Sequence, residues 1–320
     1  MSLALEVNDL SKTFGGGTTL FGRKRPAVHA VRSTSFSVRQ GETLGIVGES
    51  GCGKSTLARM LVGLLPPSSG EIVIEGEDLG GLTGDTAAFG KRIQYVFQDP
   101  ISSLNPRKTI RQIMEAPLIH LLGLDAPARK ARIAELFDAV NLRAEFLDRY
   151  PHEFSGGQAQ RIGIARALAA SPRILVLDEP VSALDVSVQA QVLNLLADLR
   201  KVFDLTYLFI SHDLAVVEAV SDRIAVLYFG AIVEIGGAEE VFANPSHPYT
   251  RLLASSAPVV GRPLAPAKDA LGELPDPLNP PPGCAFADRC PKVQNKCRDS
   301  IPQLGNNGSD HRSACFYPLS

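Results

Sequence analysis

The sequence reads Thr43-Leu44-Gly45-Ile46-Val47 and continues as Gly48-Glu49-Ser50-Gly51-Cys52-Gly53-Lys54-Ser55. The first five residues have the composition of a buried strand, and apolar positions recur with helical spacing over residues 54–64 until Pro66-Pro67 ends the pattern. A glycine-rich segment between a strand and a helix is the context that a phosphate-binding P-loop requires. The sequence therefore predicts a strand, P-loop and helix unit of the α/β class.

The P-loop pattern predicts a site for a triphosphate. Glycine backbones can turn so that several N–H groups and the positive end of the following helix point at one phosphate chain. We expect Lys54 to bind the β and γ phosphates and the Ser55 hydroxyl to coordinate Mg²⁺. The nucleotide-binding residues predicted here are Gly48, Ser50, Gly51, Gly53, Lys54, Ser55 and Thr56. A glycine-rich turn that only caps a helix is the alternative, and the flanking strand and helix argue against it.

Two carboxylates follow another apolar strand, which is predicted at residues 174–177. Asp178 and Glu179 lie where this strand ends, at the sheet edge where α/β proteins bind ligands. We expect Asp178 to orient Mg²⁺ through water and Glu179 to act as the general base that aligns the attacking water. His212, just after a predicted strand at 207–210, is expected to contact the γ phosphate. Each residue alone would also suit a structural role, but together with a P-loop they favour catalysis.

Two further segments carry polar groups without adding charge. Gln98 follows an apolar run at 93–97, and its amide can reach Mg²⁺ or water. Ser155-Gly156-Gly157-Gln158 begins a predicted helix, with Ser155 as the N-cap and the glycines leaving the first N–H groups open to an anion. Because the chain already has one P-loop, this second phosphate receptor fits an ATP molecule held by a partner chain. A helix start with flexible glycines is the alternative.

In their order along the chain, these segments resemble the ATP-binding cassette (ABC) family. They correspond to the Walker A motif, Gln98, the signature segment, the Walker B motif, Ser182-Ala183-Leu184-Asp185 and His212. The resemblance implies an ATPase in which Ser155 and Gly157 contact the γ phosphate held by a partner. It also implies that Asp185 links the two sites and that Phe14 stacks on adenine. Phe14 stands where many members have Tyr, and Phe154 stands where many have Leu.

The predicted fold class is α/β, a P-loop ATP-binding cassette with several parts. Strands that alternate with helices predict a mostly parallel sheet core. Short β-like runs in the first third of the chain predict an antiparallel β subdomain, and the pattern at 109–150 predicts an α-helical subdomain. Prolines become frequent beyond Phe242. We therefore predict a nucleotide-binding domain at 1–243, with its helical subdomain at about 99–153, and a small Cys-rich extension at 244–320.

Two segments resemble the dipeptide and oligopeptide importer branch, which also carries nickel complexes and opines. They are Gln98-Asp99-Pro100-Ile101-Ser102-Ser103-Leu104-Asn105-Pro106-Arg107 and Asn244-Pro245-Ser246-His247-Pro248-Tyr249-Thr250-Arg251-Leu252-Leu253. The resemblance implies a subunit that binds and hydrolyses ATP and energises import of peptides or a related small solute through closure and reopening of a dimer. The implied partners are a second ABC ATPase subunit, usually a paralogue, two transmembrane permease subunits and an extracytoplasmic solute-binding protein.

Four of the five cysteines lie near the end of the chain, at Cys284, Cys290, Cys297 and Cys315. In a reducing compartment, four thiolates suggest either structural Zn²⁺ or an iron–sulfur cluster. The closely spaced pairs of a zinc ribbon are absent, so the loop lengths favour the cluster. The resemblance points the same way, because the extension of this branch is similar to one that holds a 4Fe–4S cluster. Zinc, free thiols and disulfides remain alternatives.

Charge and hydropathy narrow the function further. The formal net charge of −2 gives no general positive field, so we expect no nucleic-acid partner. No stretch approaches the roughly 18–20 apolar residues of a membrane-spanning helix, and the first residues lack the features of a secretory signal. We expect a peripheral protein at the cytoplasmic face of the inner membrane. Two alternatives are a soluble ABC ATPase without a transport role and a redox-regulated ATPase centred on the cysteines.

Overall fold

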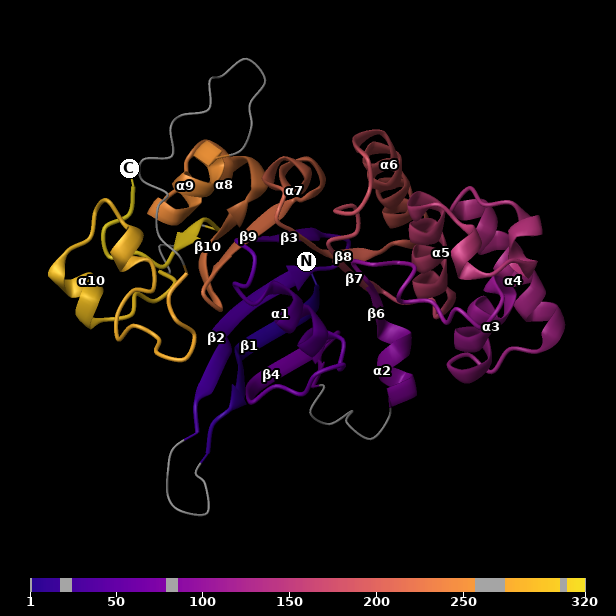
Figure 1. Ribbon diagram of the computed structural model, residues 1–320, viewed down its shortest axis with the longest axis horizontal. Coiled ribbons are helices and arrows are strands. Elements are labelled where there is room, and N and C mark those ends of the chain that lie inside the picture. The colour runs from indigo at the N-terminus through magenta and orange to yellow at the C-terminus, as the bar shows by residue number, and fades with distance from the viewer. Residues whose placement is uncertain (1, 18–24, 79–85, 257–273, 306–309, 320) are drawn as a thin grey trace. The chain divides into compact units, whose positions relative to one another are not determined.

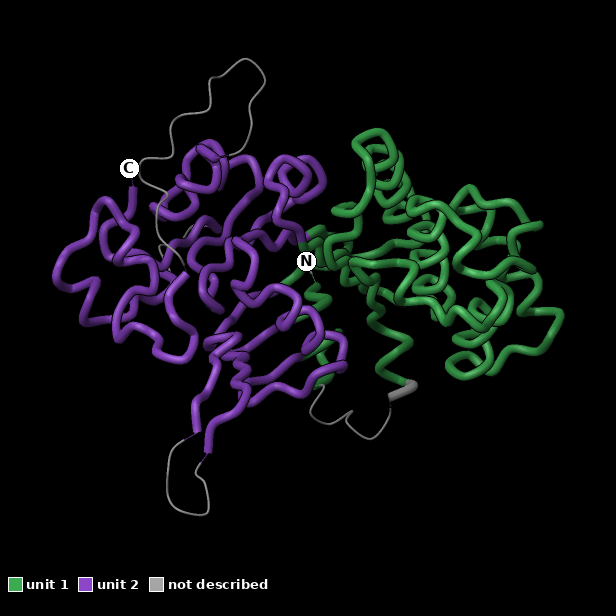
Figure 2. The backbone as a smooth tube through the Cα atoms, viewed as in Figure 1, with its two compact units in different colours: residues 1–5, 38–43, 73–210 green, residues 6–37, 44–72, 211–320 purple. Residues whose placement is uncertain are grey.

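The computed structural model describes residues 2–17, 25–78, 86–256, 274–305 and 310–319. The chain divides into two compact units, each built from separated segments of sequence (Figure 2). Unit 1 comprises residues 1–5, 38–43 and 73–210, and unit 2 comprises residues 6–37, 44–72 and 211–320. Unit 1 therefore includes the predicted helical subdomain, whereas unit 2 includes the P-loop and the C-terminal segment.

Parallel strands form the sheet of unit 1. β6 (Ile93–Val96), β7 (Ile174–Asp178) and β8 (Thr206–Ser211) lie in the order β6-β7-β8, and Ile174 pairs with Ile93 on one side and Thr206 on the other. Every residue of β7 and β8 is buried, as expected for a parallel sheet covered on both faces. The parallel register brings the carboxyl ends of β6 and β7 to the same edge of the sheet.

Helices make up most of the rest of unit 1 (Figure 1). They are α2 (Thr86–Arg92), α3 (Ile110–His120), α4 (Ala126–Ala139), α5 (Gly156–Ala169) and α6 (Val186–Phe203), with 3₁₀ helices at Ala144–Asp148 and Pro151–Glu153. α3 and α4 contact each other and both contact α5. The helical pattern predicted for residues 109–150 is confirmed.

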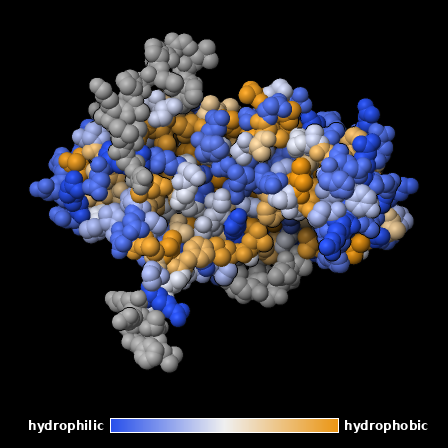
Figure 3. Space-filling view, in the orientation of Figure 1, coloured by the Kyte–Doolittle hydropathy of each residue, from blue (hydrophilic) through white to orange (hydrophobic). Residues whose placement is uncertain are grey.

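The amphipathic spacing of α3 and α4 explains this packing. Met114 and Leu118 are buried on α3, and Ile133, Leu136 and Phe137 are buried on α4. Positions three or four apart lie on one helical face, so each set turns together toward the interior. Burying each large apolar side chain contributes about 1.5–3 kcal/mol. On the face shown in Figure 3, mainly hydrophilic side chains cover the end of the unit that α3 and α4 form.

Unit 2 contains two groups of β-strands: one that includes β1 (Leu3–Gly15), β2 (Ala27–Arg39) and β4 (Ser69–Ile74), and one whose strands pair both in parallel and antiparallel. The strands of the first group lie in the order β2-β1-β4. The end of β4 pairs antiparallel with the short strand β5 (Glu77–Asp78), and these paired residues belong to unit 1. β3 (Thr43–Val47) pairs in parallel with β9 (Arg223–Tyr228), and β9 pairs antiparallel with β10 (Ala231–Gly237). The predicted α/β fold is confirmed: most of these pairings are parallel, and β10 adds an antiparallel one.

The helices of unit 2 are short. They are α1 (Lys54–Leu61), α7 (Leu214–Val220), α8 (Ala238–Ala243), α9 (Pro248–Ser256) and α10 (Asn295–Asp299), with a 3₁₀ helix, η4, at Ala287–Arg289. α1 begins at Lys54 as predicted and ends at Leu61, three residues before the predicted end at Leu64. Leu64 itself is 59% exposed, so it adds little to the buried face that holds the helix in place.

A buried carboxylate ties the C-terminal segment to β10. Glu234 is fully buried and accepts hydrogen bonds from the N–H groups of Ser246, at 2.7 Å, and His247, at 2.8 Å. His311 Nε2 lies 2.6 Å from its Oε1, next to β11 (Arg312–Ser313), which pairs with β10. Burial lowers the pKa of His247 to about 4, so its neutral Nδ1 accepts the Tyr249 N–H at 3.0 Å. The predicted boundary at residues 243/244 stays a prediction.

Candidate functional site

The P-loop of unit 2 connects the buried strand β3 to α1, and its glycines are required by close contacts. Gly53 is the N-cap of α1 with φ of 106°, and a Cβ there would lie 2.3 Å from the carbonyl oxygen of Ala30. A Cβ on Gly48 would lie 2.2 Å from the carbonyl oxygen of Leu227. A larger residue at either position would have to displace backbone. Packing therefore demands these two glycines in addition to the needs of a phosphate.

Lys54 lies inside the P-loop. The residue is only 6% exposed, and its Nζ donates hydrogen bonds to the carbonyl oxygens of Gly48, at 2.7 Å, and Glu49, at 3.0 Å. Burial raises the pKa of the Cys52 thiol, and the nearby positive charge of Lys54 opposes that shift. The Cys52 thiol is therefore protonated near neutral pH, which suits a packing role.

The remaining predicted residues of the P-loop differ in accessibility. Ser50 and Gly51 are exposed, whereas Ser55 and Thr56 are half-buried in the first turn of α1. The exposed part of the P-loop, at Ser50 and Gly51, is therefore accessible to a ligand, whereas Ser55 and Thr56 are held in the helix. The predicted Mg²⁺ ligand Ser55 is thus part of a helical turn, which limits how far its hydroxyl can move.

In unit 1, the two carboxylates after β7 have distinct environments. Asp178 is only 3% exposed and accepts a hydrogen bond from the hydroxyl of Tyr95 on β6. Glu179 has φ of +48°, in the left-handed region that residues other than glycine rarely adopt. Its N–H donates to the carbonyl oxygen of Ile210 at 2.8 Å. Such backbone strain is typical of functional positions that the surrounding fold holds in place.

Gln98 and Glu179 are brought together, as a shared role requires. Gln98 Nε2 donates a hydrogen bond to Glu179 Oε2 at 2.9 Å. Gln98 follows β6 and Glu179 follows β7, so the parallel register of these strands accounts for the contact. The sequence reasoning missed Tyr95, although a hydroxyl inside an otherwise apolar strand, three residues before Gln98, was an available signal.

The predicted signature segment forms the start of α5. Ser155 is its N-cap, and a capping box links the Ser155 and Gln158 side chains to each other's backbone N–H groups. A Cβ on Gly157 would lie 2.5 Å from Cγ1 of Val188 on α6. Asp185 caps α6 by accepting the Val188 N–H at 3.0 Å. The start of α5 and the start of α6 therefore pack against each other within unit 1.

Asp185 has a stabilised negative charge. The Ser187 hydroxyl donates a hydrogen bond to Asp185 Oδ1 at 2.7 Å, and this bond, with the Val188 N–H, lowers the pKa of Asp185. Asp185 is also exposed. An ionised, exposed carboxylate at a helix start suits the predicted contact with a partner chain.

Two other predicted residues lie in unit 2. His212 is exposed and directly follows β8, and the next residue, Asp213, caps α7. Phe14, near the end of β1, is 41% exposed and has Lys12 Nζ 5.3 Å from its ring centroid. An exposed aromatic face of this kind is suited to stacking on a base.

The four C-terminal cysteines line one small cavity in unit 2. Cys284, Cys290, Cys297 and Cys315 surround a volume of about 10 Å³. Burial raises the pKa of the Cys284 thiol to about 11 and also raises the pKa values of Cys290 and Cys315. All four are free thiols, so the disulfide alternative is not observed.

The arrangement of these thiols differs from the predicted metal site. Across the described ranges, no group of three or more His, Cys, Asp or Glu side chains is arranged to hold a metal ion. The reason is physical: the cavity of about 10 Å³ is barely large enough for one water molecule, which needs about 10–15 Å³. As the side chains lie, the cavity has no room for a 4Fe–4S cluster, so the thiols would have to turn before they could hold a metal group.

Within the part of the chain that the structure describes, no helix has both the length and the apolar character needed to span a membrane.

Two family models match this chain, and several known proteins are similar to it over most of its length. Residues 31–182 match the family model described as ABC transporter, and residues 233–297 match the one described as oligopeptide/dipeptide transporter, C-terminal region. The oligopeptide transport ATP-binding protein AppF of Bacillus subtilis is 48% identical, over 97% of this chain and 96% of its own. The dipeptide transport ATP-binding protein DppF of Haemophilus influenzae is 49% identical, over 92% of this chain and 90% of its own.

Solved structures of ABC ATPases have a fold similar to that of this chain. A dimeric structure of the ATP-binding cassette MJ0796, in a post-hydrolysis state bound to ADP and Pi, is 29% identical to this chain. The match covers 73% of this chain and 98% of that cassette, with a TM-score of 0.65. CbiO1 from Clostridium perfringens, part of the ABC transporter complex cbiONQ, is 27% identical with the same TM-score of 0.65.

The P-loop, the carboxylates after β7 and these comparisons define the class, and the chain belongs to the ABC transporter family as an ATP-binding, ATP-hydrolysing subunit. Its C-terminal region narrows the assignment to the oligopeptide/dipeptide transporter branch. The predicted family, fold class and ATPase activity are confirmed. The comparisons support neither the ABC ATPase without a transport role nor the ATPase centred on the cysteines.

Proposed function

We propose that this chain is the peripheral motor of an importer for dipeptides or oligopeptides, acting at the cytoplasmic face of the membrane. The observation that carries the catalytic part is the hydrogen bond from Gln98 to the carboxylate of Glu179, a residue whose backbone lies in the left-handed region. The cargo is proposed because the C-terminal region matches the oligopeptide/dipeptide family and the relatives carry peptide-transport names.

Each residue of the proposed ATP site has a role that its surroundings support. Lys54 binds the β and γ phosphates by transferring its hydrogen bonds from the Gly48 and Glu49 carbonyl oxygens. Ser55, Asp178 and Gln98 are the residues that would hold Mg²⁺, and the ion supplies charge neutralisation on the phosphate oxygens. The Tyr95 hydroxyl donates a hydrogen bond to the carboxylate of Asp178 and so fixes its orientation for the role we propose at the ion's water shell.

Glu179 and His212 complete the proposed chemistry. Glu179 orients the attacking water and accepts its proton, while the Gln98 amide holds the carboxylate in place at 2.9 Å. His212 is placed immediately after β8, where its exposed ring can contact the γ phosphate. Phe14 stacks on adenine through its exposed ring.

A second cassette completes the site in this proposal. Ser155, Gly156, Gly157 and Gln158 begin α5, and a helix start with two glycines offers N–H groups and a positive dipole end to a phosphate. Asp185 then links the two sites from the adjacent helix start. We propose a paralogous ATPase as the partner, two transmembrane permeases that follow the closure, and an extracytoplasmic solute-binding protein that delivers the cargo.

ATP turnover by the purified chain and by the purified complex tests this function. Because the γ-phosphate donors come from the partner, we expect the isolated chain to bind ATP but to turn it over about a hundredfold more slowly than the complex, the usual effect of missing transition-state donors. Full turnover by a monomeric chain, verified by light scattering at the assay concentration, would contradict a shared site.

We further propose that the four C-terminal cysteines bind a 4Fe–4S cluster, with Zn²⁺ as the alternative. The convergence of all four thiols on one cavity supports this, although binding would require the side chains to turn and lose their protons. We expect visible absorbance that bleaches with dithionite, and iron with acid-labile sulfide, in anaerobically purified chain. Colourless protein with one zinc supports the alternative, and metal-free protein refutes both. No step of ATP hydrolysis depends on this group.

A further inference from the structure

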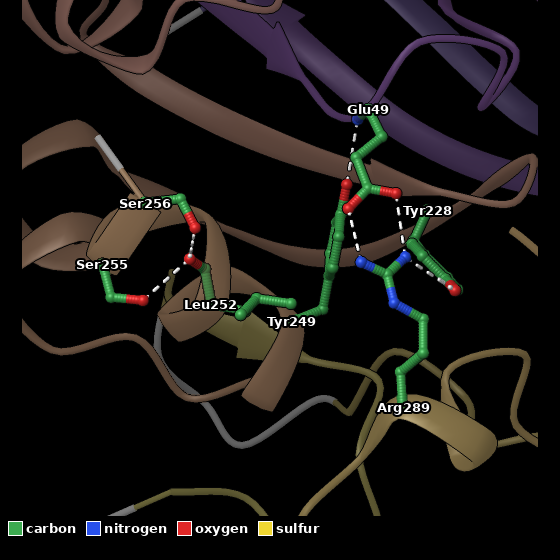
Figure 4. A network of polar contacts seen from close by, with 7 residues as sticks. All are labelled: Glu49, Tyr228, Tyr249, Leu252, Ser255, Ser256 and Arg289. Carbon is green, nitrogen blue, oxygen red and sulfur yellow. Dashed lines mark hydrogen bonds and ion pairs between the residues drawn. The ribbon is translucent and has the colours of Figure 1, made fainter. Parts of the chain in front are cut away.

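Arg289 of the C-terminal segment forms an ion pair with Glu49 of the P-loop (Figure 4). Its two terminal nitrogens donate hydrogen bonds to the two carboxylate oxygens of Glu49, each at 2.8 Å. A guanidinium fork matches a carboxylate in this bidentate way, which fixes orientation as well as distance. The Arg289 side chain is only 9% exposed and that of Glu49 is 30% exposed. The hydrogen bonds that Arg289 donates to Glu49 raise the pKa of Arg289, so the pair stays charged.

Aromatic rings hold the guanidinium in place. The Arg289 guanidinium carbon lies 5.8 Å from the ring centroid of Tyr228 and 5.6 Å from that of Phe286. The Tyr228 hydroxyl also accepts a hydrogen bond from Arg289 at 3.4 Å. Tyr228 and Phe286 are nearly fully buried and pack edge to face with each other. Arg289 is therefore fixed before any ligand arrives, so little side-chain entropy is lost in holding Glu49.

Glu49 is held at each of its polar groups by a different element. Its N–H donates to the hydroxyl of Tyr249 on α9 at 2.9 Å, and its carboxylate accepts from Arg289 (Figure 4). Its carbonyl oxygen accepts from Nζ of Lys54 at 3.0 Å. One residue thus connects α9, η4 and the lysine of the P-loop. A shift of the Glu49 backbone would move the carbonyl oxygen against which Lys54 is positioned.

An ordinary stabilising ion pair is the competing explanation, and the same segment supplies an example of one. Arg298 donates to Asp288 at 2.7 Å, but the two side chains are 56% and 83% exposed. Exposed pairs of this kind contribute about 0–1 kcal/mol to stability. Removing Arg289 instead leaves the Glu49 carboxylate partly buried beside aromatic rings without its counter-charge, which favours a different P-loop backbone.

We propose that Arg289 is a positioning residue for ATP binding: it fixes Glu49, and through the Glu49 carbonyl oxygen it sets the position of Lys54. The C-terminal segment is then a working part of the nucleotide site and not a separate module. The inference rests on the proposed role of Lys54 in holding the triphosphate.

Titration of the full-length chain with a fluorescent ATP analogue tests the proposal. We expect Arg289→Ala to weaken binding about tenfold, within the roughly 5–150-fold range of ordinary coupling energies. Arg289→Lys should recover part of the loss, because it keeps the charge but not the fork. Arg298→Ala is the matched control and should bind as wild type does. Glu49→Gln should lose as much as Arg289→Ala, and the double variant should lose no more than either alone.

Circular dichroism and thermal unfolding of each variant separate positioning from a loss of fold. A folded Arg289→Ala protein with wild-type affinity would overturn the proposal, and so would an equal loss in Arg298→Ala. If Arg289→Ala does not fold, Arg289→Lys and Glu49→Gln carry the same test, and wild-type affinity in both would overturn it. A wild-type chain that binds no ATP analogue would contradict the assigned nucleotide site itself, which is a different failure.

Discussion

Glu179→Gln is expected to lower steady-state ATP turnover by about a hundredfold or more, the usual contribution of a general base, while ATP binding stays unchanged. The amide keeps the size of the side chain but cannot accept a proton from water. Its oxygen can still accept the hydrogen bond from Gln98 that Glu179 Oε2 accepts at 2.9 Å, so the local structure should persist. The measurement is phosphate release by the assembled complex, together with ATP affinity.

Glu75→Gln is the matched control for this experiment. Glu75 is exposed and has φ of +50°, close to the +48° of Glu179, so the same substitution is made at a residue with a similar φ. We expect wild-type turnover from the Glu75 variant. Unchanged turnover in the Glu179 variant would remove Glu179 as the base and leave water activation to another group. ATP that stays bound to a long-lived closed dimer would support the assignment further.

The local elements of the site could be predicted because their signals are local. β3 is a run of five apolar or small residues, and the P-loop glycines and Lys54 follow it directly. β1 starts with a β-like run at residues 3–7, but the strand continues to Gly15. Its second half mixes exposed and half-buried residues, and a strand without a continuous buried face lacks the alternation that sequence reasoning depends on.

The contacts that organise the site could not be predicted, because they join distant positions. Tyr95 reaches Asp178 across 83 residues, and Arg289 reaches Glu49 across 240. Neither a tyrosine nor an arginine in a sequence indicates such a distant partner, because both are common in ordinary strands and turns. The cysteines show the opposite case: their spacing brought them to one cavity as expected, but spacing alone says nothing of how the thiols are turned.

Lys54→Ala is expected to act on binding, in contrast to the Glu179 variant. A hydrogen bond to a charged group is worth about 1.5–3 kcal/mol. Loss of the ammonium that holds two phosphates should therefore weaken ATP affinity by about a hundredfold. The P-loop should keep its turn, because the Cys52 N–H still donates to the Glu49 carbonyl oxygen at 3.3 Å. Titration with the fluorescent ATP analogue measures the effect, and Lys201→Ala, at an exposed lysine in α6, is the control.

The two variants together separate the two halves of the chemistry. Lys54 lies in unit 2 on the segment that Arg289 holds, and Glu179 lies in unit 1 after β7. If Lys54→Ala bound ATP normally but lost turnover, Lys54 would contact the phosphates only in the transition state. The proposed link from Arg289 to ATP affinity would then have no lysine to act through, because a residue that does not contribute to ground-state binding cannot transmit a change in it.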